Sequence, residues 1–343
     1  MVLHNKINKE ELKIRLMEED FKRITISFYK YFNIQDPQEF RNKLYQQWDE
    51  LGCFGRIYIA KEGINAQMSV PELQLEKFLS ILDGHQDIYQ IPIKYAIEDD
   101  GKSFYKLTIK VRPKIVADGL DDGAFDTTNV GQHLSAMEFH EGVSNPDNLV
   151  IDMRNHYESE IGHFENAITP DVDTFKEEID FVIENFSDKK EQKILLYCTG
   201  GIRCEKASAY LRHHGFKDVN QLYGGVIEYA QQIKKAGIKS KFIGSNFVFD
   251  ERLSENINGQ IISHCHQCGT TSDRHTNCAN KACHLLFIQC EKCAETYHGS
   301  CSTDCKEVVM LPEDVQKEIR KEGVHRNANK RAFNKGRHGS LVT

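Results

Sequence analysis

The segment around Cys198 contains the residue types needed for nucleophilic chemistry. An apolar stretch, Lys193–Tyr197, leads directly into Cys198, and a helical pattern over Cys204–His214 follows a short loop. A loop that enters a helix N-terminus directs its free backbone N–H groups inward, and these groups together with the helix dipole stabilise an anion. The same field lowers the pKa of a thiol and makes the thiolate available as a nucleophile. We therefore predict that Cys198 is catalytic; the alternative is a buried core cysteine at a strand end.

The loop ends at Arg203, which we expect to be a second catalytic residue because its guanidinium supplies a cation at the mouth of the loop. Between these two residues, backbone N–H groups are expected to form an anion cradle. Two glycines in this stretch permit backbone conformations that a side chain would obstruct. The cradle residues are Thr199, Gly200, Gly201 and Ile202.

A second group of chemically active residues is a set of cysteines near the C-terminus. Eight of the eleven cysteines form four closely spaced pairs, and two thiolates at such spacing can bind one tetrahedral metal ion. The pairs are Cys265 and Cys268, Cys278 and Cys283, Cys290 and Cys293, and Cys301 and Cys305. Eight ligands suit two structural zinc ions, because a closed four-thiolate site leaves no position for water or substrate. The spacing leaves open which pairs share an ion, and reduced thiols or disulfides are the alternative.

Basic residues are concentrated in the last part of the chain, where they could contact a nucleic-acid backbone. The candidates are Arg326, Lys330, Arg331, Lys335 and Arg337. A disordered, solvated tail would have the same composition. The net charge of −7 argues against attraction of nucleic acid to the whole surface, so any such binding must be local.

Length and composition indicate a soluble protein of several domains. The chain has 343 residues, of which 40% are hydrophobic and 28% charged. No apolar run approaches the roughly 20 residues of a membrane span, and residues 1–20 lack the apolar centre of a secretory signal. We therefore expect a cytoplasmic protein that is not integral to a membrane.

The residues up to 236 divide into two α/β patterns. Strands over 24–32, 56–60, 65–70, 93–98 and 105–111 alternate with helices over 37–51 and 71–82. This β-α-β-β-α-β order predicts a ferredoxin-like α+β domain over residues 1–115, including a charged N-terminal extension. A linker rich in Asp and Gly is expected over 116–135.

The second α/β pattern extends over residues 136–236. Buried strands at Leu149–Asp152 and Ile194–Cys198 and an amphipathic helix over Thr174–Asn185 predict a parallel sheet flanked by helices. The predicted organisation ends with a connector and Cys-rich metal-binding segment over 237–306 and a basic tail over 307–343.

Three segments of the second domain resemble the signatures of a rhodanese domain. They are Ile151–Arg154 with Glu158 and Gly162–Ile168, the Cys198–Arg203 loop, and Leu222–Val226. The resemblance implies that Cys198 carries a persulfide. Related phosphatases have one more residue in the loop, and the tighter ring here leaves less room for a tetrahedral phosphate, which disfavours a phosphatase.

Three residues near the loop allow two interpretations each. Asp152 and Arg154 could form a structural ion pair or belong to the site. Cys204 could resolve a disulfide or persulfide at Cys198, or it could be an inward-facing helix residue.

The whole arrangement is similar to the bacterial tRNA uridine hydroxylase family. The segments that carry the similarity are Ala60–Ala66, Gly131–Ser135 and Cys198–Lys206. The resemblance implies oxygen-dependent conversion of the tRNA wobble uridine to 5-hydroxyuridine, with Cys198 as the catalytic cysteine and molecular oxygen as co-substrate. It also implies that the partner is the tRNA anticodon loop. We further expect a sulfur donor or a small-molecule reductant as a partner, and the sequence leaves the source of reducing equivalents open.

Two other functions fit parts of the sequence. The loop alone predicts a sulfurtransferase that moves sulfur from thiosulfate or a persulfide to a thiol or RNA acceptor, although the additional domains favour a macromolecular substrate. A non-catalytic RNA-binding scaffold is the third hypothesis, and the presence of both Cys198 and Arg203 argues against it.

Overall fold

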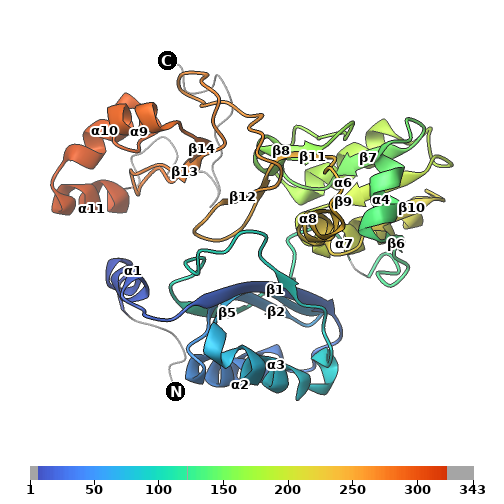
Figure 1. Ribbon diagram of the computed structural model, residues 1–343, viewed down its shortest axis with the longest axis horizontal. Helices are drawn as coiled ribbons and strands as arrows, with labels where there is room; N and C mark the ends of the chain where they lie inside the picture. Colours follow the sequence, from blue (N-terminus) through green and yellow to red (C-terminus); the bar gives the residue numbers. More distant parts are fainter. Residues whose placement is uncertain (1–6, 122, 323–343) are drawn as a thin grey trace.

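The computed structural model describes residues 7–121 and 123–322 (Figure 1). An N-terminal sheet with two helices, a central α/β part and a Cys-rich part are arranged around a common centre. A short helix, α1 (Lys9–Met17), precedes the first strand. Within the described residues, no helix is long and apolar enough to cross a membrane.

The N-terminal part is the expected ferredoxin-like unit, and all five predicted strands are present, one more than the β-α-β-β-α-β order contains. Its five-stranded sheet has the order β4-β1-β3-β2-β5. The strands are β1 (Arg23–Tyr31), β2 (Phe54–Ala60), β3 (Gly63–Pro71), β4 (Lys94–Tyr95) and β5 (Leu107–Val111). Strand β5 pairs parallel with β2 at the edge, whereas β1 is antiparallel to both β3 and β4. Two short 3-10 helices, η1 (Glu72–Gln74) and η2 (Gln86–Ile88), lie before and after the helix of residues Leu75–Asp83.

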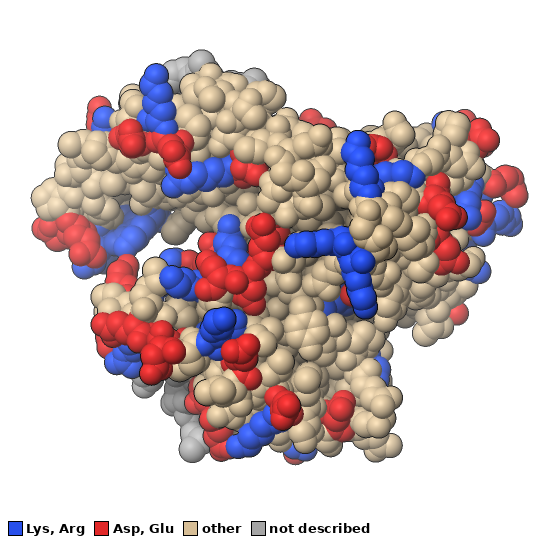
Figure 2. Space-filling view, viewed as in Figure 1, with Lys and Arg blue, Asp and Glu red and all other residues tan. Residues whose placement is uncertain are grey.

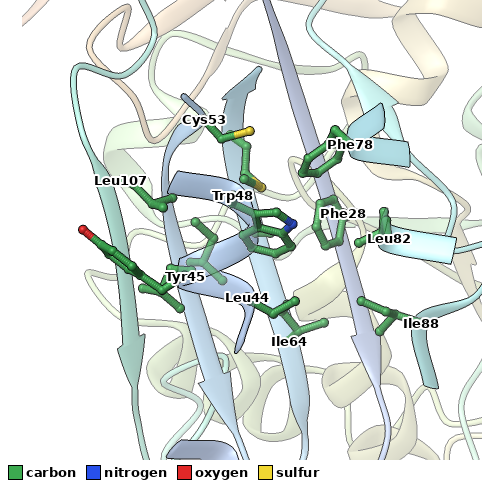
Figure 3. Close-up of a cluster of buried hydrophobic side chains, with 14 of the residues drawn as sticks. Phe28, Leu44, Tyr45, Trp48, Cys53, Ile64, Phe78, Leu82, Ile88 and Leu107 are labelled. Atoms are coloured by element: carbon green, nitrogen blue, oxygen red, sulfur yellow. The ribbon is translucent and has the colours of Figure 1, made fainter. Parts of the chain in front are cut away.

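The two helices of this part cover one face of the sheet only. Helix α2 (Pro37–Glu50) begins with Pro at its first position and Asp36 as its N-cap, and α3 is Leu75–Asp83. Buried side chains from both helices and the sheet, among them Phe28, Trp48 and Phe78, form the core (Figure 3). Alternation along the strands directs the intervening residues to the opposite face, which Figure 1 shows turned toward the rest of the molecule.

The central part contains the predicted parallel sheet flanked by helices. Its order is β6-β10-β9-β7, with all pairs parallel. The strands are β6 (Gln132–Leu134), β7 (Leu149–Asp152), β9 (Ile194–Tyr197) and β10 (Val219–Leu222). Ile194 and Leu196 pack in one core with α6 (Phe175–Asn185) and α7 (Ile202–His213). Leu195 and Tyr197 pack on the other side with α4 (Ala136–Val143) and α8 (Gly225–Ala236). The fully buried strand β9 therefore has apolar residues on both faces.

The segments expected to be linker and connector both take part in sheets. Strand β6 lies within the predicted linker and joins the parallel sheet beside β10. Strand β11 (Phe242–Phe247), in the predicted connector, pairs with β8 (Gly162–Phe164) and with β12 (Ser254–Asn256). A short helix, α5 (His156–Ser159), lies between β7 and β8. Such short strands have too little periodicity to be recognised from sequence, because their pairing partners are distant in the chain.

The Cys-rich part consists of a two-stranded sheet and three helices. These are β13 (His275–Asn277), β14 (Leu286–Ile288), α9 (Glu291–Tyr297), α10 (Thr303–Met310) and α11 (Glu313–Glu322). Strand β14 has two different faces. Phe287 packs among four of the cysteines, whereas Leu286 and Ile288 pack against Tyr157 and Phe247. The cysteine cluster is therefore joined to the central part by an apolar contact.

Candidate active site

Cys198 lies at the carboxyl end of β9, where the parallel strand meets the first turn of α7. The backbone N–H of Gly201 donates a hydrogen bond to its Sγ at 3.1 Å. Helix α7 begins at Ile202, two residues before the start that the sequence suggests. Arg203 and Cys204 therefore belong to the first helical turn, and their backbone N–H groups also face the sulfur.

At two positions near this loop, neighbouring atoms lie so close to the backbone that only glycine fits. Gly201 has a φ of +95°, and a Cβ there would lie 2.9 Å from the Tyr29 hydroxyl oxygen. Gly225 has a φ of +68°, and a Cβ there would lie 2.5 Å from the carbonyl oxygen of Cys198. We expected glycine to be required at position 200 as well, but a Cβ there would meet nothing within 4 Å. Gly200 lines an open cavity next to Cys198.

The surroundings of Cys198 favour its thiolate. Burial alone would raise the pKa of Cys198, but a hydrogen bond from the Cys204 thiol, the charge of Arg203 and backbone N–H groups lower it to about 6. Burial and the adjacent sulfur raise the pKa of Cys204, which therefore remains a thiol and a donor. Cys204 is fully buried and faces inward, as one of its two interpretations required.

Arg203 differs in part from the role that the sequence suggested. Arg203 is 8% exposed, and its guanidinium forms a two-point ion pair with Glu158, with both N–O distances 2.7 Å. Thr199 Oγ1 lies within 3.4 Å of both side chains. Arg203 is thus a buried, neutralised cation that lowers the pKa of Cys198, and not an open cation at the mouth. Sequence reasoning missed Glu158 as its partner, because nothing in the spacing of 45 residues indicates the contact.

Asp152 and Arg154 form a structural ion pair. Both are fully buried, and the Arg154 guanidinium contacts the Asp152 carboxylate at 2.7 and 2.8 Å. The Tyr197 hydroxyl also donates to Asp152, at 2.7 Å. Arg154 in turn donates to the carbonyl oxygen of Gly162 at 2.6 Å, which fixes β8 beside β7. Neither charged residue lines the cavity above Cys198.

A cavity of about 500 Å³ lies between the Cys198 loop and the open face of the N-terminal sheet. One wall consists of Cys198, Thr199, Gly200, Ile202 and Arg203. The opposite wall is made by polar and aromatic residues of the sheet, namely Thr25, Ser27, Tyr29, Arg56, Tyr58, Asn65, Gln67 and Lys94. The residues between β11 and β12 close a third side with Phe249 and Arg252. Residues of both domains therefore line the cavity, and the buried Cys198 is one of them.

The N-terminal domain contacts the reactive loop and its helix directly. The Tyr29 hydroxyl donates to Glu205 Oε1 at 3.1 Å, and Lys206 Nζ lies 2.7 Å from Glu62 Oε2. His133 Nε2 lies 2.9 Å from the same oxygen of Glu205. The segments Ala60–Ala66, Gly131–Ser135 and Cys198–Lys206 thus meet at one place, although the sequence gives no sign of their contact.

The eight cysteines of the C-terminal part form two groups, each of which could hold a metal ion. Their sulfur atoms lie within 4.8 Å of one another in each group. One group is Cys265, Cys268, Cys290 and Cys293, and the other is Cys278, Cys283, Cys301 and Cys305. The first pair along the chain thus combines with the third, and the second with the fourth.

The distances between the sulfurs fit tetrahedral coordination. The sulfur atoms of Cys268 and Cys290 lie 3.6 Å apart in the first group, and in the second group Cys301 lies 3.6 Å from Cys305 and 3.7 Å from Cys283. Four sulfurs about 2.3 Å from a zinc ion lie roughly 3.8 Å apart, whereas a disulfide requires about 2.05 Å. All eleven cysteines are free, which excludes the disulfide alternative in this structure. The basic residues Arg326, Lys330, Arg331, Lys335 and Arg337 lie outside the described residues.

Comparison with known protein families agrees with this site. A rhodanese-like domain model matches residues 135–232, so the fold and the loop define a rhodanese-domain protein. The model of the UPF0176 acylphosphatase like domain matches residues 23–115, and that of the rhodanase C-terminal region matches residues 243–306.

Full-length relatives identify the family. A protein of Leptospira interrogans named tRNA uridine(34) hydroxylase is 55% identical over 95% of this chain and 89% of its own length. Proteins of the same name from Photorhabdus laumondii and Pectobacterium carotovorum are 52% and 54% identical, over 98% and 93% of this chain and 95% and 90% of their own lengths. The chain belongs to the tRNA uridine(34) hydroxylase family.

Proposed function

We propose that this protein hydroxylates uridine 34 of tRNA to 5-hydroxyuridine in the cavity above Cys198, with molecular oxygen as the oxidant. The observation that carries the proposal is the cavity shared by the reactive loop and the N-terminal sheet. A sulfurtransferase for small thiols requires only the loop, whereas a second wall of tyrosine and amide side chains suits a nucleobase. Bases of an anticodon loop can be unstacked and inserted into such a pocket.

A basic groove next to this cavity supports the choice of RNA as substrate. It has a volume of about 440 Å³, and Arg56 lines both spaces. Its other basic residues are Arg41, Lys106 and Lys110, which outnumber its acidic residues Asp250 and Glu251. Figure 2 shows acidic and basic side chains interspersed on the face in view, so a local groove is the kind of site that could attract a phosphate backbone to this acidic protein.

The two cysteine groups are proposed to hold zinc in structural sites. Four thiolates at tetrahedral spacing are a preferred zinc environment, and they leave no open coordination position for catalysis. The basic tail is proposed as an additional tRNA contact, and the cytoplasm as the location, since tRNA is modified there. Reducing equivalents would come from a small molecule or a sulfur donor.

The decisive experiment is nucleoside mass spectrometry of tRNA from cells that lack this protein. The cells are complemented with the wild-type chain, with Cys198→Ala or with Cys53→Ala, whose cysteine lies in the N-terminal core. We expect 5-hydroxyuridine-derived nucleosides with wild type and Cys53→Ala and none with Cys198→Ala. Growth without oxygen should abolish the product in every strain. Unchanged nucleosides in all strains would refute the proposal.

Sulfur transfer is a second candidate function, favoured by the cradle around Cys198. A sulfur atom bound to Cys198 would be anionic and would gain the same N–H groups and the charge of Arg203. Formation of thiocyanate from thiosulfate and cyanide, or of a thiol persulfide from thiosulfate and a thiol, with release of sulfite and without any change in tRNA, would make this the principal activity.

A further inference from the structure

Four cations line the cavity above Cys198: Arg56, Lys94, Arg203 and Arg252. Two of them are neutralised by carboxylates, since Arg203 pairs with Glu158 and Arg252 contacts Asp250 and Glu255 at 2.6 Å. Arg56 is exposed and donates to a backbone carbonyl oxygen. Lys94 is different, because it is only 8% exposed and no ion pair joins it to a carboxylate in the described part of the chain.

The position of Lys94 is fixed from both domains. Strand β4 is two residues long, and Lys94 pairs with Ser27 of β1. Its Nζ lies 4.5 Å from the centroid of the Tyr29 ring, and its Cε lies 3.7 Å from the position of a Cβ on Gly224. Gln231 of α8 donates to the carbonyl oxygen of Tyr95 at 2.6 Å, which joins β4 to the central domain. Lys94 is therefore held beside the Cys198 loop.

Burial of an ammonium group without a carboxylate partner is costly, and such groups concentrate at functional sites. Burial lowers the pKa of Lys94 to about 8, against the opposing charges of Cys198, Glu228 and Glu205. The Lys94 amine is therefore protonated in most molecules at pH 7. The aromatic face of Tyr29 stabilises the charge without occupying the N–H donors in a salt bridge.

We propose that Lys94 is a further catalytic residue of the hydroxylation, a role that rests on the proposed function. Its ammonium donates a hydrogen bond to the O4 carbonyl oxygen of the uracil bound above Cys198. When the anionic sulfur at Cys198 adds to C6 of the ring, its electron pair forms the S–C6 bond. The C5–C6 π electrons then form the C4–C5 double bond, and the negative charge moves to O4.

This addition involves no oxidation, no leaving group and no net proton transfer, so its electrons balance within the sulfur and the ring. The enolate that results is nucleophilic at C5, the carbon at which the product carries its hydroxyl group. In the rhodanese-type loop, the charge of Arg203 is already paired with a carboxylate, because both of its terminal nitrogens donate to Glu158. The N-terminal domain therefore supplies the charge that stabilises the substrate anion.

The test compares full-length wild type, Lys94→Met, Lys94→Arg and the control Lys30→Met, whose lysine lies in β1 and donates to the Asp87 carbonyl. Each is induced in cells that lack the protein, and 5-hydroxyuridine is followed over time, relative to protein amount. Losing one preorganised donor should lower the initial rate on the order of 10²–10³-fold for Lys94→Met. Lys94→Arg should regain part of the rate because it keeps the charge, and Lys30→Met should match wild type.

Two readouts on the purified variants separate catalysis from structure. Affinity for tRNA should be the same in Lys94→Met and wild type. Because the charges of Lys94 and Cys198 interact, the pH midpoint of the iodoacetamide reaction at Cys198 should rise in Lys94→Met, but the rate above that midpoint should equal that of wild type. A wild-type rate for Lys94→Met overturns the role of Lys94 and leaves the proposed function intact. A loss of tRNA affinity or of Cys198 reactivity that accounts for the slower rate also overturns it. If the wild-type chain forms no 5-hydroxyuridine, the proposed function itself is wrong, and the role of Lys94 fails with it.

Discussion

Lys206 and Glu62 form an ion pair across the two domains, with 2.7 Å between Nζ and Oε2. Lys206 is 3% exposed and lies on the helix that begins at the reactive loop, whereas Glu62 lies in the turn between β2 and β3. Lys206 Nζ is also 3.8 Å from Asp118 Oδ2 and 5.4 Å from the centroid of the Tyr31 ring. The pair therefore joins the N-terminal sheet to the helix that follows the reactive loop.

Replacing Glu62 should impair hydroxylation without affecting the sulfur. We expect Glu62→Gln to lower the rate of 5-hydroxyuridine formation on the order of 10-fold to 100-fold, because the sheet would no longer be held in register with the loop. Cys198 should react with iodoacetamide as in wild type, since Glu62 is not among the groups that lower its pKa. The exposed Glu72→Gln is the matched control. Equal activity of Glu62→Gln and Glu72→Gln would contradict this prediction.

The reactivity of Cys198 should depend on pH with a midpoint near 6. Its pKa is lowered in the folded protein, so the thiolate persists down to about pH 6 and is lost below it. Cys204→Ala removes one donor and should raise the midpoint by roughly one pH unit, whereas Cys204→Ser keeps a donor and should raise it less. Alkylation rates at Cys198, measured by peptide mass spectrometry between pH 4 and about pH 10, give these midpoints. Identical midpoints for all three proteins would exclude Cys204 as a donor.

The ion pair of Arg203 with Glu158 should dominate the local stability of the loop. Burial opposes ionisation of Glu158, but Arg203 holds its pKa below the usual range. Glu158→Gln leaves a buried guanidinium uncompensated and should lower the free energy of unfolding by about 3–5 kcal/mol. Asp180→Asn, which breaks the exposed pair with Lys176, should change it by less than about 1 kcal/mol. Chemical denaturation measures the free energy of unfolding of both variants. Similar losses in the two would show that the buried pair contributes no more to stability than the exposed pair.

Metal content should reflect the interleaved cysteine groups. Elemental analysis should give two ions per chain for wild type and one for either Cys293→Ser or Cys301→Ser. The double variant should contain none, and its C-terminal part should become sensitive to protease while the N-terminal sheet stays protected. Cys53→Ala should retain both ions. If Cys293→Ser and Cys301→Ser together still retain one ion, the two-group assignment is incorrect.

Several properties of this protein follow from local sequence. The strand Ile194–Tyr197 and the following loop have the apolar run, glycines and helix start that place Cys198 at an anion cradle. The β-α-β-β-α-β order and the four cysteine pairs are also local patterns, because each depends on residues a few positions apart. The family resemblance rests on segments of the same kind, and full-length relatives confirm it.

Only the tertiary structure decided which distant residues complete the site. Glu158 neutralises Arg203, and Tyr29 and Lys94 form the wall opposite Cys198, because the uncovered face of the N-terminal sheet packs toward the loop. Cys265 and Cys268 share a site with Cys290 and Cys293, and not with the next pair along the chain. Such contacts depend on how separate elements pack, and pairwise spacing in one sequence contains no information on that arrangement.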